Sequence, residues 1–136
     1  MTKKTMATIL GIDWGSKRVG VSRANSQLRM AEPLVTLECN GECLDDIISL
    51  AEEESVSTVV VGLPRNLEGG ETEQSKEIRE FAQKLDESLQ CSVVMQDETL
   101  STNAGQELAS LYPKADRDSL AATVILQDYL NANQDR

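Results

Sequence analysis

The chain has 136 residues, a formal net charge of −10 and few aromatic side chains, namely one Trp, two Tyr and one Phe. This length suits one domain, residues 1–136, whose core must be filled by Val, Ile, Leu and Ala. The negative charge argues against a general polyanion binder, and no apolar stretch is long enough to cross a bilayer. We therefore expect a cytoplasmic domain that does not associate with membranes.

Metal sites built from nitrogen and sulfur are unexpected in this chain. It has no His, and its three cysteines, Cys39, Cys43 and Cys91, contain no CxxC pair. A structural zinc site would need a fourth ligand of another kind, so we discount one. In the cytosol, reduced thiols are the expected state of these cysteines.

The N-terminal part of the chain predicts three consecutive strands. Residues 7–13 form an apolar run that ends in a carboxylate and turns at Gly15, and residues 19–25 form a second run. The third strand falls within residues 28–37, where Pro33 favours an edge position or a bulge. Their connections are too short for helical crossovers, so we expect an antiparallel meander.

Strands and helices alternate in the rest of the chain. The predicted elements are, in order, a helix around residues 44–51, a strand over 55–61 closed by Gly62-Leu63-Pro64, a helix capped by Thr72 or Ser75, a strand over 91–95, a helix capped by Ser101 or Thr102, and a last helix capped by Asp116. Strands that alternate with helices should run parallel to the first strand. The predicted fold is therefore α/β, a five-stranded mixed sheet of three antiparallel and two parallel strands flanked by helices.

The last helix carries a run of apolar residues that should pack on the sheet. The expected packing residues are Leu120, Ala121, Val124, Ile125 and Leu126.

Three carboxylates stand at positions where chemistry is expected in such a fold. In open α/β sheets, ligands bind beyond the carboxyl ends of parallel strands. Asp13 ends the first strand, Glu98 follows the fifth, and Asp118 lies in the first turn of a helix that could dock nearby. If they converge, they form an all-oxygen site for Mg²⁺ or Mn²⁺, and two such ions can hold a phosphodiester for in-line displacement.

Each of these acids also has a purely structural explanation. Asp13 could accept hydrogen bonds from turn N–H groups, and Glu98 could be an ordinary surface residue. Asp97 could cap a helix, and Asp118 could be favoured by the positive end of its helix dipole. Spacing alone leaves the convergence of the three acids open.

Basic residues lie mostly in or near turns, whereas acidic residues crowd two predicted helices. The bases concerned are Lys17, Arg18, Arg65, Lys114 and Arg117. Acidic runs on helices are usually solvated faces. The bases could therefore still form one local phosphate-binding patch on an acidic protein.

Four segments, in the right order, resemble the motifs of the YqgF family, also called RuvX. Residues 11–21 resemble its opening GIDxGxKRxGV motif, and residues 60–69 resemble its GLPxNxxG loop. Residues 97–102 resemble its DERLTT segment, and residues 118–130 resemble its closing DxxAAxxILQxYL helix. The resemblance covers nearly the whole chain and implies an RNase H-like fold.

This resemblance implies a metal-dependent nuclease that matures the 5′ end of 16S ribosomal RNA. An older interpretation of the family is Holliday-junction resolvase, so the partner is structured RNA (pre-16S rRNA) or branched DNA. By matching position, the family's acidic triad falls on Asp13, Glu98 and Asp118, with Mg²⁺ or Mn²⁺ as the cofactor. A resolvase makes two symmetric cuts and is normally dimeric, so we expect a monomer or a weak homodimer.

The candidate substrate contacts come from the same motifs and from the bases in turns. They are Lys17, Arg18, Gly62, Arg65, Ser101 and Thr102. Lys17 and Arg18 could instead be a solvated turn, and Gly62 could simply end a strand. Ser101 or Thr102 is better explained as a helix cap than as a catalytic hydroxyl.

The chain departs from the family pattern at two places. Thr99 stands where family members usually carry Arg, which removes a bidentate phosphate or carboxylate partner. The basic run before the last motif is reduced to Lys114 and Arg117, with Asp116 between them. Asp116 competes with Asp118 as a ligand, but the Ala-Ala-x-x-Ile-Leu-Gln pattern favours Asp118. These departures motivate a third hypothesis, a binding module without catalytic activity.

Overall fold

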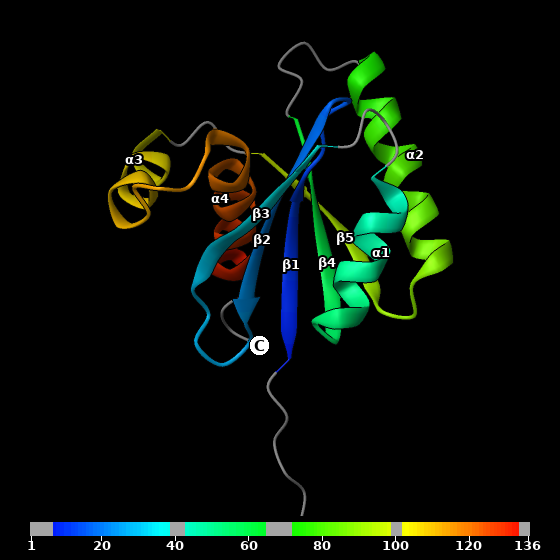
Figure 1. The fold of residues 1–136 in the computed structure, drawn as a ribbon, viewed down its shortest axis with the longest axis horizontal. Helices are drawn as coiled ribbons and strands as arrows, with labels where there is room; N and C mark the ends of the chain where they lie inside the picture. Colours follow the sequence, from blue (N-terminus) through cyan, green and yellow to red (C-terminus); the bar gives the residue numbers. More distant parts are fainter. Residues whose placement is uncertain (1–6, 39–42, 65–71, 99–101, 134–136) are drawn as a thin grey trace, which may run out of the picture.

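The computed structural model describes residues 7–38, 43–64, 72–98 and 102–133, with only the backbone described for 102–105. Its elements are β1 (Thr8–Asp13), β2 (Arg18–Asn25), β3 (Ala31–Glu38), α1 (Leu44–Glu53), β4 (Val56–Leu63), α2 (Glu73–Ser88), β5 (Ser92–Asp97), α3 (Thr102–Leu111) and α4 (Arg117–Ala132) (Figure 1).

One five-stranded sheet with the order β3-β2-β1-β4-β5 forms the centre of the molecule. The pairs β1–β2 and β2–β3 are antiparallel, and the pairs β1–β4 and β4–β5 are parallel. The predicted mixed sheet, with its meander and two further parallel strands, is confirmed. Because β1, β4 and β5 run in one direction, their carboxyl ends meet at one edge of the sheet.

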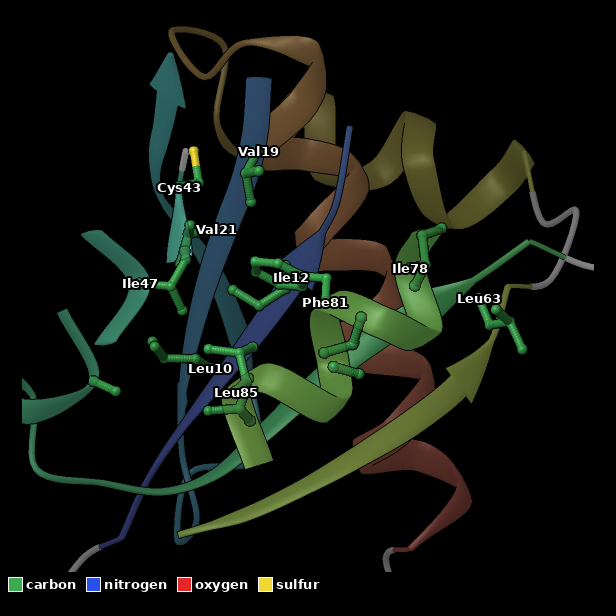
Figure 2. Packing of buried hydrophobic residues seen from close by; sticks show 14 residues of the cluster. Leu10, Ile12, Val19, Val21, Cys43, Ile47, Leu63, Ile78, Phe81 and Leu85 are labelled. Carbon is green, nitrogen blue, oxygen red and sulfur yellow. The ribbon is translucent and has the colours of Figure 1, made fainter. Parts of the chain in front are cut away.

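Helices cover both faces of the sheet, α1 and α2 on one side and α4 on the other, with α3 beyond it (Figure 1). Alternate residues of each strand therefore enter two different cores. The larger core joins Leu10 and Ile12 to Ile47, Phe81 and Leu85 of the helices (Figure 2). The smaller core lies under α4 and consists of Ile9, Ala24, Ala31, Val60, Ile125, Leu126 and Leu130.

Glycines of the sheet let α4 approach closely. A Cβ atom at Gly11 would meet Leu126 and the backbone of Ala122, and one at Gly62 would run into Ile125. These contacts select the buried face of α4, which consists of Ser119, Ala122, Thr123, Ile125, Leu126 and Leu130. The prediction was right for Ile125 and Leu126 but wrong for Leu120, Ala121 and Val124, which are only half-buried.

The predicted strand boundaries need two corrections. β4 continues to Leu63 because Gly62 and Leu63 pair with Gln96 and Asp97 of β5, so Gly62 does not end the strand. β3, Ala31–Glu38, lies in the predicted region but runs one residue past it, to Glu38. It is an edge strand whose register shifts near Pro33, so both expectations for that proline are confirmed.

Two predicted helix caps are confirmed. Thr72 caps α2, since its Oγ1 accepts from the Ser75 backbone N–H at 3.1 Å while Ser75 Oγ accepts from the Thr72 N–H at 2.9 Å. Asp116 caps α4 by accepting from the backbone N–H of Ser119 at 3.0 Å. Ser101, one of the two candidate caps for α3, lies outside the described residues.

The expectation of reduced cysteines is wrong for Cys43. This residue is disulfide-bonded, while Cys91 is a free, half-buried thiol. The expectation rested on the compartment alone, which sets the redox poise but not which thiols lie in contact. Within the described ranges, no helix has the length and apolar character needed to cross a membrane.

Candidate active site

Asp13 lies at the carboxyl end of β1, opposite Gly20 of β2. Side chains alternate along a strand, and Gly11, two residues earlier, faces α4. The Asp13 side chain therefore belongs to the α4 side of the sheet. The next residue, Trp14, turns to the other side, where its ring centroid lies 6.2 Å from that of Phe81. This aromatic contact anchors the chain directly after Asp13.

Glu98 follows β5 at the same edge of the sheet. Its backbone N–H donates to the carbonyl oxygen of Leu63, the last residue of β4, with an N–O distance of 2.9 Å. This bond holds Glu98 at the carboxyl end of the neighbouring strand. The residue is half-buried, and burial raises the pKa of its carboxyl group.

Asp118 is distant in sequence but close in space to Asp13. A Cβ atom at Gly20 would collide with the carbonyl oxygen of Asp118, so β2 and the first turn of α4 touch through their backbones. One turn further along α4, Ser22 Oγ donates to the Ala122 carbonyl oxygen at 2.7 Å. Because Gly20 is also the strand partner of Asp13, this contact brings Asp118 beside Asp13.

The three carboxylates interact electrostatically. The pKa of Asp13 is raised from 3.8 to about 7, first by burial and then by the negative charges of Glu98 and Asp118. A carboxyl group with such a pKa is half-protonated near neutral pH without a cation. Asp13 is thus coupled to both other acids selected from the sequence, and a positive charge nearby would relieve the repulsion that it experiences.

The donor set suits a hard cation in its chemistry. Carboxylate oxygens are the ligands of Mg²⁺ and Mn²⁺, and the sequence contains no His. Nevertheless, within the described ranges no group of three or more Asp, Glu, Cys or His side chains is arranged closely enough to hold a metal ion. The acids are neighbours, but they do not form a closed coordination shell.

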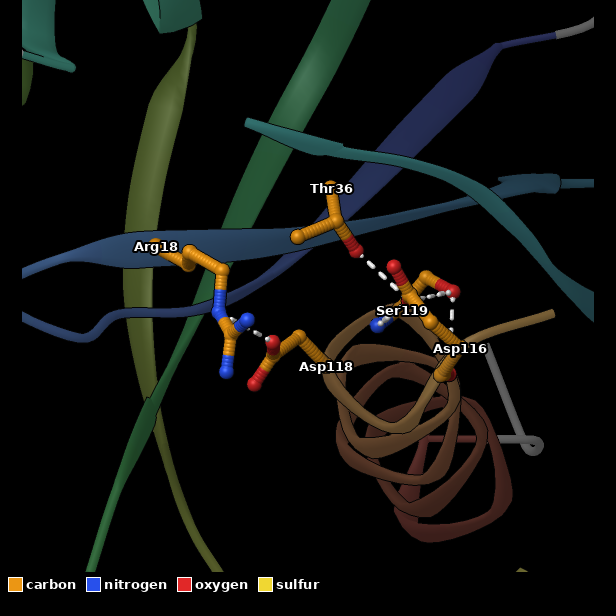
Figure 3. Close-up of polar contacts among 5 residues, drawn as sticks. All are labelled: Arg18, Thr36, Asp116, Asp118 and Ser119. Atoms are coloured by element: carbon orange, nitrogen blue, oxygen red, sulfur yellow. Dashed lines mark hydrogen bonds and ion pairs between the residues drawn. The ribbon is translucent and has the colours of Figure 1, made fainter. Parts of the chain in front are cut away.

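Asp118 is engaged with a base rather than with the other acids. Its Oδ2 lies 3.1 Å from Nε of Arg18 on β2 (Figure 3). The sequence selected Arg18 for phosphate contact and gave no sign of this pairing, because the two residues lie on elements far apart in the chain.

Asp116 has a different role from Asp118. It accepts from Thr36 Oγ1 at 2.7 Å and from Ser119 Oγ at 2.8 Å, besides the capping bond from the Ser119 N–H (Figure 3). These bonds, that from Thr36 foremost, lower the pKa of Asp116. Asp118, by contrast, is one of the two acids whose negative charge raises the pKa of Asp13.

The structure assigns no clear substrate contact to the remaining candidate residues. Lys17 is exposed in the turn between β1 and β2, and Gly62 is buried inside β4 against Ile125, where helix packing accounts for it. Thr102 begins α3, but its side chain is not described. Arg65, Ser101 and the departure at Thr99 lie outside the described residues.

Comparison with known proteins gives a consistent result. The family model RuvX, described as Holliday junction resolvase, matches residues 7–132. A protein of Chloroflexus aurantiacus named "Putative pre-16S rRNA nuclease" is 37% identical over 134 residues, which cover 93% of this chain and 88% of that protein. A Rickettsia africae protein with the same name is 33% identical over 134 residues, 93% of this chain and 87% of the relative.

Solved structures share the fold at low sequence identity. RuvC of T. thermophilus in complex with a Holliday junction substrate has a TM-score of 0.67 at 12% identity, covering 94% of this chain and 96% of that one. The Fowlpox virus resolvase in complex with Holliday junction DNA has a TM-score of 0.56 at 12% identity, covering 92% and 97%.

Proposed function

This chain belongs to the RuvX (YqgF) family of nucleases, and on that premise we propose that it is a divalent-metal-dependent endonuclease. The observation that carries the proposal is the electrostatic coupling of Asp13 to Glu98 and Asp118 at one edge of the sheet. The negative charges of Glu98 and Asp118 disfavour the ionised form of Asp13, and a cation bound by the three acids would relieve this repulsion.

The roles of the side chains follow from their positions. Mg²⁺ or Mn²⁺ would polarise the scissile phosphodiester and help to activate a water molecule. Asp13, coupled to both other acids, is the central ligand, and Glu98 and Asp118 are the flanking ligands. Lys17 and Arg18, exposed beside this edge, are positioned to contact phosphate groups of the substrate.

The proposed substrate is structured RNA, with the 5′ end of pre-16S rRNA as the specific target in ribosome maturation. The names of the relatives from Chloroflexus and Rickettsia support this assignment. A protein with this substrate would work in the cytoplasm, as a monomer or a weak homodimer. Arg65, Ser101 and Thr102 remain proposed substrate contacts from the family motifs alone.

Holliday-junction resolution is the second candidate activity. The description of the matching family model and the fold shared with junction-bound resolvases favour it. It requires two symmetric cuts and hence two copies of the site. A stable dimer that cuts four-way junctions in pairs would select this activity over RNA processing.

A cleavage assay with precursor 16S RNA and a four-way DNA junction, side by side in Mg²⁺, tests the proposal. We expect RNA cleavage by the wild type and a loss of at least about 100-fold in Asp13→Asn, because an electrostatic stabiliser of the transition state is removed. The matched control is Asp97→Asn, an exposed acid at the same strand end, which should cleave like the wild type.

Two outcomes would contradict the proposal. Full cleavage by Asp13→Asn would remove Asp13 from the mechanism. Binding of RNA without cleavage, together with unshifted NMR resonances near Asp13 and Glu98 in millimolar Mn²⁺, would instead make the protein a binding module without catalytic activity.

A further inference from the structure

Arg18 forms an ion pair with one acid of the proposed metal site. It begins β2 and has the same side-chain parity as Gly20, the residue that touches the backbone of Asp118. Strand alternation therefore directs Arg18 to the α4 side, where its Nε lies 3.1 Å from Asp118 Oδ2 (Figure 3). The Arg18 and Asp118 side chains are 62% and 28% exposed, respectively.

The described part of the chain holds no group of three or more acids that could hold a metal ion, and Asp118, one of the three proposed ligands, is engaged in this ion pair. One carboxylate oxygen of Asp118 is already neutralised by the guanidinium group. Exposed ion pairs contribute little free energy, so a divalent cation that also binds two other carboxylates can displace the arginine.

We propose that Arg18 is a positioning residue that holds Asp118 while no cation is bound and is released towards the substrate when one binds. The inference rests on the proposed nuclease function and adds a coupling between cation and nucleic acid. Guanidinium forms bidentate hydrogen bonds with carboxylate and phosphate alike, so one side chain can serve both partners in turn. Because coupling is reciprocal, nucleic acid that engages Arg18 also frees Asp118 for the cation.

Calorimetric titration with Mn²⁺ tests the first half of the coupling. Arg18→Ala should bind Mn²⁺ about threefold to fivefold more tightly than the wild type, because the cation no longer competes with the guanidinium. Arg117→Ala is the matched control. It removes the same charge one residue from Asp118, yet Arg117 forms no ion pair with any described residue. We expect it to change the Mn²⁺ affinity by less than about twofold.

Steady-state cleavage of the RNA substrate tests the second half. Arg18→Ala should raise KM several-fold at saturating Mn²⁺, and Arg18→Lys, which keeps the charge without the planar fork, should recover part of the loss. Tighter metal binding together with weaker substrate binding is the signature of a shared side chain. A purely structural link between β2 and α4 would weaken both when removed.

The Mn²⁺ titrations distinguish a failure of the proposed role of Arg18 from a failure of the proposed nuclease function. If neither the wild type nor Arg18→Ala binds Mn²⁺, the proposed metal site itself fails. If the wild type binds Mn²⁺ but Arg18→Ala binds it equally or more weakly, or if Arg117→Ala tightens it to the same extent, only the role of Arg18 is overturned.

Discussion

At the scale of single residues, Asp13 has a structural cost that the proposed metal site would offset. Its carboxyl group is largely withdrawn from water and lies near two other acids, so its charged form is disfavoured in the folded chain. In the unfolded chain the same group ionises near its ordinary pKa. The difference makes the stability of the cation-free protein depend on pH.

The pH dependence can be tested with Asp13→Asn in the presence of a chelator. The pKa is raised from 3.8 to about 7 on folding, so this group lowers stability progressively as pH rises from about 4 to 7, with no further change above. Asp13→Asn should therefore be more stable than the wild type by roughly 2–4 kcal/mol at pH 8 and equally stable near pH 4. Urea unfolding at both pH values measures the difference.

Asp97→Asn, at an exposed position, is the control and should show no such pH-dependent gain. An Asp13→Asn variant that is less stable than the wild type at pH 8 would show that the carboxylate is held by favourable contacts instead.

At the scale of elements, the start of α4 separates two carboxylates that are neighbours in sequence. Asp116 precedes the helix with extended backbone, so its side chain turns back to the Ser119 N–H and to Thr36 of β3. Asp118 already lies in the first turn and faces β2. The first residue fixes where the helix begins, and the second reaches the proposed metal site.

We expect Asp116→Ala and Asp118→Asn to affect different properties. Asp116→Ala should lower the free energy of unfolding by about 1 kcal/mol, the usual value of an N-cap, while most of the cleavage activity is retained. Asp118→Asn should abolish cleavage with little loss of stability, because its exposed ion pair is weak. Thermal unfolding and the RNA assay measure the two effects.

Asp116→Ser, which can still cap the helix, should restore most of the stability lost in Asp116→Ala. Loss of cleavage in Asp116→Ser with retention in Asp118→Asn would reverse the assignment of the third acid.

Sequence patterns within a few residues predicted most of the helices and strands. The end of β4 and the buried face of α4 depend on contacts between distant segments. Thr72 and Asp116 were recognisable as caps because the groups they bind lie within three residues. The extent of β4 was not, since Gly62 and Leu63 continue the strand only through pairing with β5. The buried face of α4 was also misjudged in part, because the glycines of the sheet select it.

At the scale of the whole molecule, the charge distribution limits how nucleic acid can bind. The net charge is −10, and Arg23 is already paired with Glu32 and Glu54. Lys17 and Arg18 lie near the proposed site, and Lys114 and Arg117 flank the start of α4. Binding should therefore rest on a few phosphate contacts around one edge of the sheet rather than on a broad basic surface.

The salt dependence of RNA binding measures the number of these contacts. With two to four phosphates contacted, log K should fall against log salt with a slope of roughly −1.5 to −3.5. Fluorescence anisotropy with a labelled precursor 16S fragment between low and moderate salt gives this slope. A slope steeper than about −6 would indicate an extensive basic surface that the charge distribution does not supply.

The candidate site was predictable where topology dictates it and unpredictable where side chains from distant segments meet. Asp13 ends β1 and Glu98 follows β5, and the carboxyl ends of these strands share an edge because both run parallel to β4. The pairing of Arg18 with Asp118 depends on the docking of α4 across β2, for which the sequence holds no local signal. The same docking gives Asp116 and Asp118 different partners, Thr36 for the first and Arg18 for the second.

The proposed catalytic site depends on glycines beneath α4, because these residues carry no Cβ atom. A Cβ atom at Gly20 would collide with the Asp118 carbonyl oxygen. Further along the helix, a Cβ atom at Gly11 would collide with Leu126, and one at Gly62 with Ile125. A substitution by alanine at Gly20 would push the start of α4, and with it Asp118, away from the other two acids, although all three carboxylates would still be present. Random mutagenesis for lost activity should therefore recover these apparently featureless positions alongside the carboxylates.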